Sequence, residues 1–375
     1  MTGLQFSLQM ILAMAVAGAV SYSLLSTFAA FAFLRIPRPI PKAGEPISVL
    51  KPLAGVDDGL EQNLRSFFEQ DYRDFELIFA VRHELDACVP LLERLQKEYA
   101  SVPSRLLITG ESPYPNAKVF SLSGMFEVAR HDLLVMSDSD IRVDCQFLAR
   151  SAGEFADGSV SLATCPYFAI AGASFWSRME AQGMNTTFWQ GALTARLLDG
   201  MKFAVGPTIV ARKKAIEAIG GVESVKDFLA DDFELGRLAA ESGANVVLSR
   251  NVVEHRIGSE TARQNFAHRI RWGRTSRRSR PFGYGGQIFT YPLPLALFLL
   301  VVKPGWWPLA ASAIGIRFLA GEIVARWVLG GRMNWILAPL EDLIGFVFWI
   351  AGFFGNSVSW RGRTYQLDRQ GRGVA

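Results

Sequence analysis

An uncharged N-terminal run places the strongest constraint on this chain. Met1–Leu34 contains no Asp, Glu, Lys or Arg. Its part from Ser7 to Leu34 is long enough to cross a hydrocarbon core of about 30 Å, which takes about 20 residues. A basic n-region and a small-residue cleavage site are lacking, so the pattern predicts a retained membrane anchor rather than a signal peptide. Basic residues follow directly, which by the positive-inside rule predicts a cytoplasmic domain downstream. They are Arg35, Arg38, Lys42 and Lys51.

A second apolar block fills the C-terminal quarter, and 50% of the 375 residues are hydrophobic. Gly283–Val302 is uncharged and of spanning length, and Leu343–Trp360 is a further candidate. Pro304–Leu329 is apolar but carries charged residues, which either face protein partners or mark a segment lying in the membrane interface. These are Arg317, Glu322 and Arg326. A basic tail predicts a cytoplasmic end and an even number of C-terminal crossings. Its arginines are Arg361, Arg363, Arg369 and Arg372.

Two other kinds of site are not supported. Cys88, Cys145 and Cys165 are odd in number, far apart and without a His partner pattern, so neither a zinc site nor a disulfide framework follows from them.

The run FAHRIRWGRTSRRSRP is rich in arginine just before the second membrane block, which favours a topology signal and an anionic-lipid surface. No aromatic platform or reading helix accompanies it, so nucleic-acid binding is disfavoured. Its clustered arginines are Arg269, Arg271, Arg274, Arg277, Arg278 and Arg280.

Between about Ile47 and Pro281, short apolar runs alternate with stretches of helical periodicity. ISVLKPL, FELIFAV and SRLLITG are typical of strands, whereas LEQNLRSFFEQ and VPLLERLQKEY carry apolar residues at helical spacing. NAKVFSLSGMFEVA then leads into DLLVM, another short apolar run. Such alternation predicts an α/β domain with a mostly parallel sheet. The stretch PRPIPKAGEP predicts a stiff linker between the anchor and this domain.

Two carboxylates follow the strand predicted over Leu133–Met136. Asp138 and Asp140 stand where this strand ends, and the carboxyl ends of such strands open into the crevice where α/β sheets bind ligands. With one residue between them, the two can share a hard divalent cation if the backbone turns there. The same residues suit a helix N-cap, because Ser and Asp favour helix starts and turns. The α/β context favours metal or phosphate binding over capping.

A second acidic pair, Asp231 and Asp232, precedes an apolar helical face formed by Phe233, Leu235 and Leu238. Complementarity to the helix dipole, worth about 0.3–1 kcal/mol, explains acidic residues at this position. By themselves, these two residues therefore predict a helix start.

The chain carries six short motifs in the order LKPLAGVDDGLEQNLRSFFEQDY, NAKV, SDSDIRV, GPTIVARKKAIEAIGG, LADDFELG and HRIRW. This series resembles glycosyltransferase family 21, the ceramide glucosyltransferase-like proteins, and bacterial hopanoid glycosyltransferases are similar too. The resemblance covers Ile47–Pro281 together with the membrane segments on either side. It implies a GT-A fold, with helices on both faces of the sheet, a UDP-sugar donor, Mg²⁺ or Mn²⁺, and an inverting single-displacement transfer.

By that resemblance, Asp138 and Asp140 hold the donor diphosphate through the metal ion. Lys118, at the start of a predicted helix, adds a positive charge near the phosphates. Asp232 matches the family's general base, which takes the proton of the acceptor hydroxyl, and Asp231 supports or orients it.

The motif HRIRW matches the family's Q/RxxRW motif, although His268 stands where the family has Gln or Arg. Arg271 is expected to contact the leaving diphosphate, where positive charge stabilises the transition state. Trp272 stacks on the acceptor, closes the donor pocket or anchors the chain at the membrane interface. An acidic residue is expected to contact the nucleobase of the donor. Glu84 and Asp86 are the two candidates, and the sequence does not choose between them.

The implied acceptor is a membrane lipid, ceramide or a hopanoid polyol, and the implied sugar is of the glucose or N-acetylglucosamine type. We expect an integral protein of the bacterial inner membrane with a cytoplasmic catalytic domain. One alternative is a processive polysaccharide synthase, which needs more spans and usually keeps Gln where His268 stands. The other is a non-enzymatic membrane protein with a degenerate transferase domain, against which the retained motif residues argue.

The expected organisation follows from these assignments. The N-terminal anchor and its flank occupy 1–36, the linker 37–46 and the catalytic domain 47–281, whereas the C-terminal membrane segments occupy 282–360 and the basic tail 361–375.

Overall fold

The computed structural model describes residues 3–360 and 363–374 and divides into two compact units, here called the sheet unit and the helical unit. The sheet unit comprises Pro37–Gly172, Met201–Ser259 and Gly371–Ala375, and the helical unit comprises Met1–Ile36, Ala173–Gly200 and Glu260–Gln370. The catalytic domain expected over 47–281 is continuous in sequence. The sheet unit differs from it by leaving out Ala173–Gly200 and Glu260–Pro281 and by including Pro37–Pro46 and Gly371–Ala375.

A seven-stranded sheet forms the core of the sheet unit. Its strands are β1 (Ile47–Pro52), β2 (Phe75–Val81), β3 (Ser104–Ile108), β4 (Leu133–Ser137), β6 (Leu162–Thr164), β8 (Thr208–Arg212) and β9 (Val246–Leu248). They lie in the order β3-β2-β1-β4-β8-β6-β9. β1 to β4 are parallel, β8 is antiparallel to β4 and β6, and β9 is parallel to β6. β2 and β4 are buried throughout, which explains why both strands are apolar apart from Glu76 and Ser137.

Helices connect the strands of this sheet. They are α2 (Leu60–Phe68), α3 (Val89–Glu98), α4 (Ala117–Val128), α5 (Phe147–Glu154), α8 (Lys213–Glu217), the short helix η2 (Val222–Val225) and α9 (Asp231–Glu241). Apolar residues of α4 and α9, among them Val119, Met125 and Leu235, pack in one core with Leu50 of β1 and Met136 of β4. The strands and helices predicted from Ile47 to the end of β4 are confirmed, as is the mostly parallel α/β sheet.

A second, three-stranded sheet follows from the turn after β4. Its strands are β5 (Ile141–Arg142), β10 (Val253–Arg256) and β7 (Tyr167–Ile170), in that order. Because β10 pairs with β5 in antiparallel register, His255 lies opposite Ile141. Ile141 is the residue that directly follows Asp140 in the sequence. This pairing brings a residue from late in the sequence to the carboxyl end of β4.

The end of the chain also belongs to the sheet unit. The N–H of Gly373, in β13 (Gly373–Val374), donates to the carbonyl of Asp227 (2.7 Å), and the guanidinium of Arg372 lies 5.5 Å from the ring centre of Phe228. One arginine of the predicted basic tail therefore packs beside the segment that leads into α9. Arg361 of that tail lies outside the described residues.

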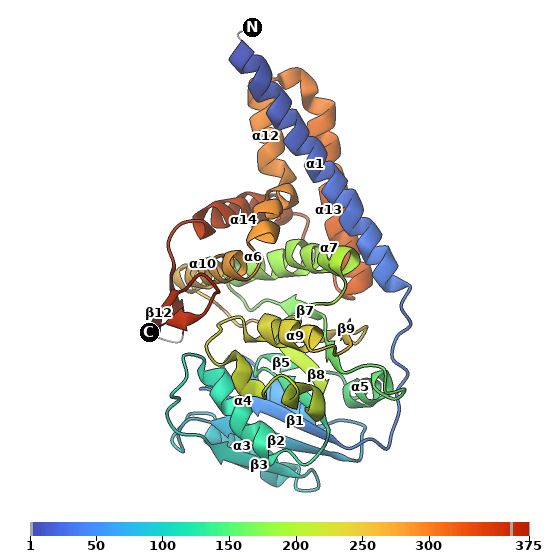
Figure 1. Cartoon of the computed structure of the whole chain (residues 1–375), viewed down its shortest axis with the longest axis vertical. Coiled ribbons are helices and arrows are strands. Elements are labelled where there is room, and N and C mark those ends of the chain that lie inside the picture. The colour runs from blue at the N-terminus through green and yellow to red at the C-terminus, as the bar shows by residue number, and fades with distance from the viewer. Residues whose placement is uncertain (1–2, 361–362, 375) are drawn as a thin grey trace. The chain divides into compact units, whose positions relative to one another are not determined.

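Three helices of the helical unit pack side by side, α1 (Gly3–Leu34), α12 (Pro292–Val302) and α13 (Trp307–Ile323) (Figure 1). Val16 and Ala19 of α1 are buried in one apolar cluster with Leu295 and Leu299 of α12. The remaining elements are α6 (Phe175–Gly183), η1 (Met184–Phe188), α7 (Trp189–Asp199), α10 (Ala262–Ser279), α11 (Pro281–Gly286), η3 (Gln287–Thr290), η4 (Pro304–Trp306), η5 (Val324–Val328), α14 (Ala338–Gly352), β11 (Ser357–Trp360) and β12 (Arg363–Leu367).

Two helical stretches, Gln5–Leu34 and Pro304–Val328, are long and apolar enough to cross a membrane. Pro281–Thr290 and Pro292–Val302 form a pair bent by 60° and add a third if they count as one broken span. These stretches agree with the predicted anchor and with two of the three C-terminal candidates. The third candidate, Leu343–Trp360, is wrong as a spanning helix, because α14 ends at Gly352 and the chain continues into β11.

The charge buried in α13 is paired with protein groups. This agrees with the first alternative for Pro304–Leu329, that its charged residues face protein partners. Arg317 is only 4% exposed, and its Nε lies 3.1 Å from Oδ1 of Asp342. Its remaining N–H groups donate to Thr187 (2.6 Å) and to Gln190 (2.5 Å). A buried charge inside an apolar helix is tolerated when it is paired in this way.

The arginines at the end of α10 bind the end of α14. Arg277 donates to the carbonyl of Phe353, to that of Gly355 (2.9 Å) and to the side chain of Asn356 (2.9 Å). Arg278 donates to the same asparagine oxygen (2.5 Å). Cations here satisfy carbonyl groups that a helix C-terminus leaves unpaired. The anionic-lipid surface expected for this cluster stays a prediction.

Candidate active site

Asp138 and Asp140 lie in the turn between β4 and β5. The N–H of Asp138 donates to the carbonyl of Pro207 (2.9 Å), and the N–H of Ile141 donates to the carbonyl of Asp138 (3.3 Å). Among the described residues, the next helix after these two aspartates is α5, which begins only at Phe147, so the N-cap explanation of Asp138 and Asp140 is wrong. The backbone turn that a shared cation requires is present.

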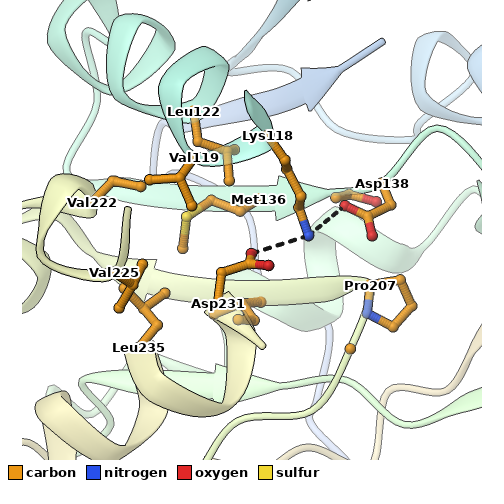
Figure 2. Close-up of a pocket in the computed structure, with 13 residues that line it drawn as sticks. Lys118, Val119, Leu122, Met136, Asp138, Pro207, Val222, Val225, Asp231 and Leu235 are labelled. Carbon is orange, nitrogen blue, oxygen red and sulfur yellow. Dashed lines mark ion pairs between the residues drawn. The ribbon is translucent and has the colours of Figure 1, made fainter. Parts of the chain in front are cut away.

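Lys118 bridges the two acidic pairs that the sequence singles out. Its Nζ lies 2.8 Å from Oδ1 of Asp138 and 3.3 Å from Oδ2 of Asp231, as Figure 2 shows. Asn116 fixes this geometry, because its side-chain oxygen caps α4 and its amide donates to Oδ1 of Asp231 (3.2 Å). Burial opposes the charge on Lys118, but Asp138 and Asp231 outweigh it and raise the pKa of the ammonium above its usual value.

Asp231 and Asp232 are the first two residues of α9, which confirms the predicted helix start. The N-cap is Ala230, and it makes no side-chain capping bond. Oδ2 of Asp232 accepts a hydrogen bond from the N–H of Gly206, a residue held in the left-handed region with φ of 63°. Burial and the adjacent charge of Asp231 raise the pKa of Asp232 above the usual aspartate range.

Lys51, which in the sequence counts only among the basic residues after the anchor, belongs to this site. It is fully buried in β1, and its Nζ donates to the carbonyl of Asp138 (2.7 Å) and lies 3.8 Å from the ring centre of Phe67. Burial lowers the pKa of Lys51 to about 7, against the attraction of Asp138 and Asp140. A lysine inside an otherwise apolar buried strand was the signal for this role.

His255 is a second residue that sequence reasoning missed. Its Nε2 lies 3.1 Å from Oδ2 of Asp140. Burial would raise the pKa of Asp140, but His255 and Lys51 outweigh it, and the pKa lies below its usual range. At Asp138, burial and the charge of Asp140 raise the pKa despite Lys118. Nothing local in the sequence marks His255, because β10 reaches the site only through the pairing of β5.

The donor atoms fit a hard divalent cation. Oδ1 of Asp140 is buried and has no hydrogen-bond partner within residues 3–360 and 363–374. Such an oxygen is costly unless a cation or donor satisfies it. Carboxylate oxygens on a turn are the ligands that Mg²⁺ and Mn²⁺ prefer. Asp138 and Asp140 are therefore the residues placed to hold a metal ion.

Glu84 and Asp86 are the two candidates for contact with the nucleobase of the donor, and Asp86 is the one held by hydrogen bonds within the fold. Its carboxylate accepts hydrogen bonds from the N–H of Gly55 (3.0 Å), in the loop after β1, and of Cys88 (3.0 Å), at the start of α3. Burial by itself would raise the pKa of Asp86, but these hydrogen bonds outweigh it and lower the pKa below its usual value. Glu84 is exposed. The contact of either residue with a donor base stays a prediction.

A cavity of about 20 Å³ lies among Lys118, Asp138 and Asp231, which is room for about one water molecule (Figure 2). Its other walls are mainly apolar, formed by Val119, Leu122, Met136, Ile209, Val222, Val225 and Leu235. Because of its size, this cavity is not a pocket for a nucleotide sugar.

The predicted HRIRW residues lie on α10 of the helical unit. Nδ1 of His268 lies 2.9 Å from Oε1 of Glu180 and 3.4 Å from Oε1 of Glu260, and its ring centre lies 4.1 Å from that of Trp272. Burial would lower the pKa of His268, but the two carboxylates outweigh it and raise the pKa. The carbonyl of Arg271 accepts a hydrogen bond from Thr275 (2.9 Å). The catalytic roles expected for these residues stay predictions.

The family described as Glycosyl transferase family 21 matches residues 10–373. The chain belongs to this family. The membership confirms the resemblance seen in the six motifs.

Curated relatives of this family 21 protein include ceramide glucosyltransferase 1 of Caenorhabditis elegans, 28% identical over 236 residues that cover 60% of this chain and 48% of the relative. A ceramide glucosyltransferase of Komagataella phaffii is 34% identical over 118 residues, covering 30% of this chain and 23% of the relative. The chain thus matches about half, or less, of the length of these relatives.

A solved mannosyltransferase from Pyrobaculum calidifontis, in complex with GDP-Man and Mn²⁺, is similar with a TM-score of 0.55 and 19% identity, covering 92% of this chain and 97% of that one. At this identity the likeness shows the fold, and the predicted GT-A fold is confirmed.

Proposed function

We propose that this family 21 protein transfers a hexose from a nucleotide sugar to the hydroxyl group of a membrane lipid. One observation carries the proposal: Asp138, Asp140, Asp231 and Asp232 meet around Lys118 at the carboxyl end of β4, in a GT-A fold. This edge of an α/β sheet is where phosphorylated ligands bind. A UDP-sugar is the donor that the family resemblance implies.

Asp138 and Asp140 would hold a divalent cation, which supplies positive charge to a diphosphate leaving group. Lys118 adds a second positive charge at the same edge, because its ammonium stays protonated at neutral pH in the field of the aspartates. Lys51 and His255 fix the two aspartates from the interior side, Lys51 through the carbonyl of Asp138 and His255 through Oδ2 of Asp140.

Asp232 is the proposed general base. Both oxygens of Asp231 are engaged, one by Lys118 and one by Asn116, which suits an orienting role. Asp232 accepts from the backbone N–H of Gly206 and has a raised pKa, so its carboxylate is a better proton acceptor than an ordinary aspartate.

The membrane segments and the relatives support the proposed class of acceptor. Gln5–Leu34 and Pro304–Val328 are candidate spans, and the curated relatives are named as ceramide glucosyltransferases. We propose a ceramide-type lipid presented at the cytoplasmic leaflet, with a hopanoid polyol as the second acceptor to be tested.

The test is an incubation of membranes containing this chain with radiolabelled UDP-glucose, UDP-N-acetylglucosamine or GDP-mannose, followed by lipid extraction. Label in one discrete glycolipid from a UDP-sugar supports the proposal, and mass spectrometry identifies the lipid. Label in polymer, label from GDP-mannose alone, or no label above membranes carrying Asp138→Ala overturns it.

A further inference from the structure

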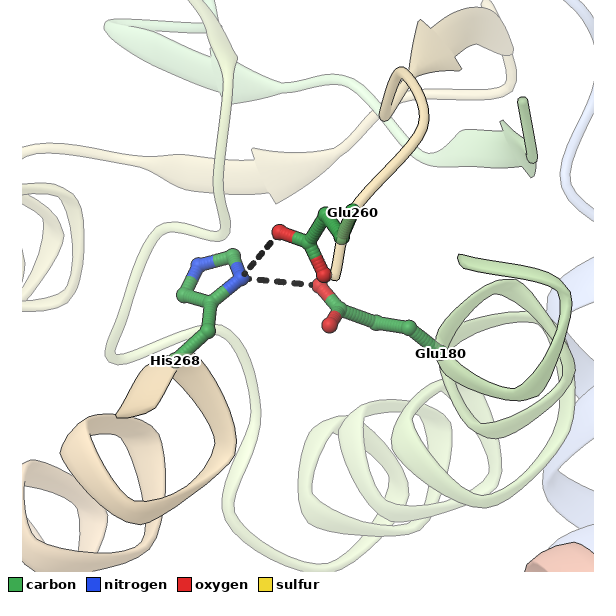
Figure 3. A group of neighbouring side chains, drawn as sticks. All are labelled: Glu180, Glu260 and His268. Carbon is green, nitrogen blue, oxygen red and sulfur yellow. Dashed lines mark ion pairs between the residues drawn. The ribbon is translucent and has the colours of Figure 1, made fainter. Parts of the chain in front are cut away.

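A second polar cluster lies in the helical unit, made of Glu180 on α6, Glu260 before α10 and His268 on α10. Figure 3 shows the two carboxylates facing the same ring nitrogen. One oxygen or nitrogen atom from each residue lies within 4.8 Å of the other two. The side chain of Glu180 is 1% exposed, whereas those of Glu260 and His268 are 20% and 26% exposed. The cluster is therefore buried on one side and accessible on the other.

The two closest atoms form an ion pair that is not a well-aligned hydrogen bond. Nδ1 of His268 and Oε1 of Glu180 are 2.9 Å apart, but their directions do not meet the geometry of a hydrogen bond. Both atoms are buried, and neither has a hydrogen-bond partner in the described part of the chain. An almost wholly buried carboxylate oxygen thus has a charge partner but no aligned donor, and a bound cation would satisfy it more fully.

The outer oxygens of the same carboxylates are held in place. The amide of Asn265 donates to Oε2 of Glu180 (2.5 Å) and of Glu260 (3.3 Å). The N–H of Glu260 donates to Ser177 on α6 (2.7 Å), and a capping box formed by Thr261 and Gln264 fixes the start of α10. These bonds leave Oε1 of each glutamate directed at His268, as outer-shell partners orient metal ligands.

The spacing and the charge of the cluster suit a transition-metal ion. Zn–N and Zn–O bonds of about 2.1 Å in a tetrahedral site place neighbouring ligand atoms about 3.4 Å apart, and the separations from Nδ1 are 2.9 and 3.4 Å. Two glutamates carry more negative charge than one imidazolium neutralises. The neighbouring Arg269 is already paired with Glu341, through bonds of 2.9 and 2.8 Å.

We propose that Glu180, Glu260 and His268 form a binding site for a divalent transition-metal ion, with Zn²⁺ as the best match to one imidazole and two carboxylates. Three protein ligands leave a fourth position for water or another ligand. The ion ties α6 to the start of α10 and so fixes the helix that carries Arg271 and Trp272. This site is separate from the one at Asp138 and Asp140, and it does not depend on the proposed function.

The test uses the full chain in detergent with Asp138→Ala and Asp140→Ala, so that cation binding at the other acidic site is not counted. After chelation and removal of the chelator, Zn²⁺ is titrated under dialysis and the bound metal is measured. Co²⁺ serves as a spectroscopic probe, since its visible absorption reports ligation by nitrogen and oxygen. We expect about one equivalent of Zn²⁺ per chain, and a rise in the thermal unfolding temperature when Zn²⁺ is added.

Substitutions in this background decide whether the ion sits at the cluster. Glu260→Gln and His268→Gln remove one ligand each. Loss of an outer-shell partner, as in Asn265→Leu, typically weakens metal binding by about 10–100-fold, so loss of a ligand itself should weaken Zn²⁺ binding by at least that much. Glu322→Gln is the matched control, since Glu322 lies on α13 of the same unit and contacts Met333 and Arg326 instead. It should leave binding unchanged.

Glu260 is partly exposed, so its variant is the one most certain to fold, which circular dichroism checks. Absence of stoichiometric Zn²⁺, or equal binding by Glu260→Gln, His268→Gln and the control, overturns the proposal. A loss of thermal stability in Glu260→Gln that is the same with and without Zn²⁺ also overturns it, because the cluster is then an ion pair without a metal.

Discussion

The sheet unit and the helical unit both bury charged side chains, but they arrange them differently. In the sheet unit, four carboxylates and three bases gather at one edge of the sheet, and Lys118 contacts Asp138 and Asp231 at once. In the helical unit, apart from the cluster of Glu180, Glu260 and His268, the buried charges form closed pairs between helices. Arg317 is paired with Asp342 at 3.1 Å, and Arg269 binds both oxygens of Glu341.

The difference separates two uses of buried charge. A cluster with shared partners and an unsatisfied oxygen, such as Oδ1 of Asp140, can exchange protein partners for ligand groups. A closed pair offers nothing to a ligand, and removing one member leaves the other charged and buried. Substitutions in the cluster around Lys118 should therefore change turnover more than folding, and those in the closed pairs of the helical unit should do the reverse.

The largest effect is expected at the metal-binding turn. Asp138→Ala and Asp140→Ala should each abolish turnover and weaken nucleotide-sugar binding, because each removes a carboxylate placed at the diphosphate. The thermal unfolding temperature should stay near that of the parent protein. The measurements are glycolipid formation, donor binding by calorimetry, and a thermal melt. Full activity in excess EDTA would sink the proposed metal role.

The next effect separates the two aspartates of α9. Asp232→Asn should lower kcat by about 10²–10⁴-fold with donor affinity nearly unchanged, because the loss is that of a general base. Asp231→Asn should be milder in kcat, since this residue orients Lys118. Steady-state kinetics with both substrates varied distinguishes them. Equal losses for the two, or a loss confined to donor affinity, would move the base elsewhere.

A third prediction concerns the helical unit. Asp342→Asn leaves the guanidinium of Arg317 buried without its counter-charge, which should lower the free energy of unfolding by about 3–5 kcal/mol. Arg326→Gln is the matched control, because Arg326 is 57% exposed and 4.0 Å from Glu322, and such exposed pairs contribute about 0–1 kcal/mol. Unfolding is followed by circular dichroism in detergent. Equal stability of the two variants would show that the buried pair contributes no more than a surface contact.

The double variant Arg317→Met with Asp342→Leu sharpens this comparison. It removes both charges, so it should be more stable than Asp342→Asn alone. Stability below that of the single variant would mean that the bonds of Arg317 to Gln190 and Thr187 hold the helices more strongly than its charge pair does.

The sequence predicted those parts of the molecule that depend on local pattern. Strands β1 to β4, the start of α9 and the position of Asp138 and Asp140 follow from short apolar runs and the residues that end them. His255 was not predictable in this way, because it reaches Asp140 only through the pairing of β10 with β5. The role of Lys51 was also missed, because a count of basic residues near an anchor does not consider burial inside a strand.

The helical unit was harder to predict for a related reason. Hydropathy alone does not distinguish a spanning helix from a shorter buried one, so the sequence predicts a span over Leu343–Trp360 although α14 ends at Gly352. Glu180 carried no signal at all. Its partner His268 lies in a different segment of the chain, and only the packing of α6 against α10 brings them together.

The smallest effect is expected at Glu154, a charged group of the sheet unit outside the catalytic edge. Its Oε2 accepts a hydrogen bond from Ser249 (2.5 Å), and burial raises its pKa from 4.5 to about 7. A carboxyl group whose pKa is higher in the folded state binds its proton more tightly there. Its contribution to stability is therefore complete below the unfolded pKa of 4.5 and is lost as the pH rises through about 7.

Glu154→Gln should remove this pH dependence, because glutamine stays neutral and still accepts the hydrogen bond of Ser249. The variant should match the parent protein at about pH 4.5 and unfold at a higher temperature than the parent at about pH 8, where the buried carboxylate is ionised. Glu93→Gln, at an exposed position of α3, is the control and should follow the parent protein at every pH. The measurement is a set of thermal melts across this range. If the unfolding temperatures of Glu154→Gln and the parent differ by the same amount at every pH, the effect comes from packing. The charge on Glu154 would then have no more influence on stability than a surface charge.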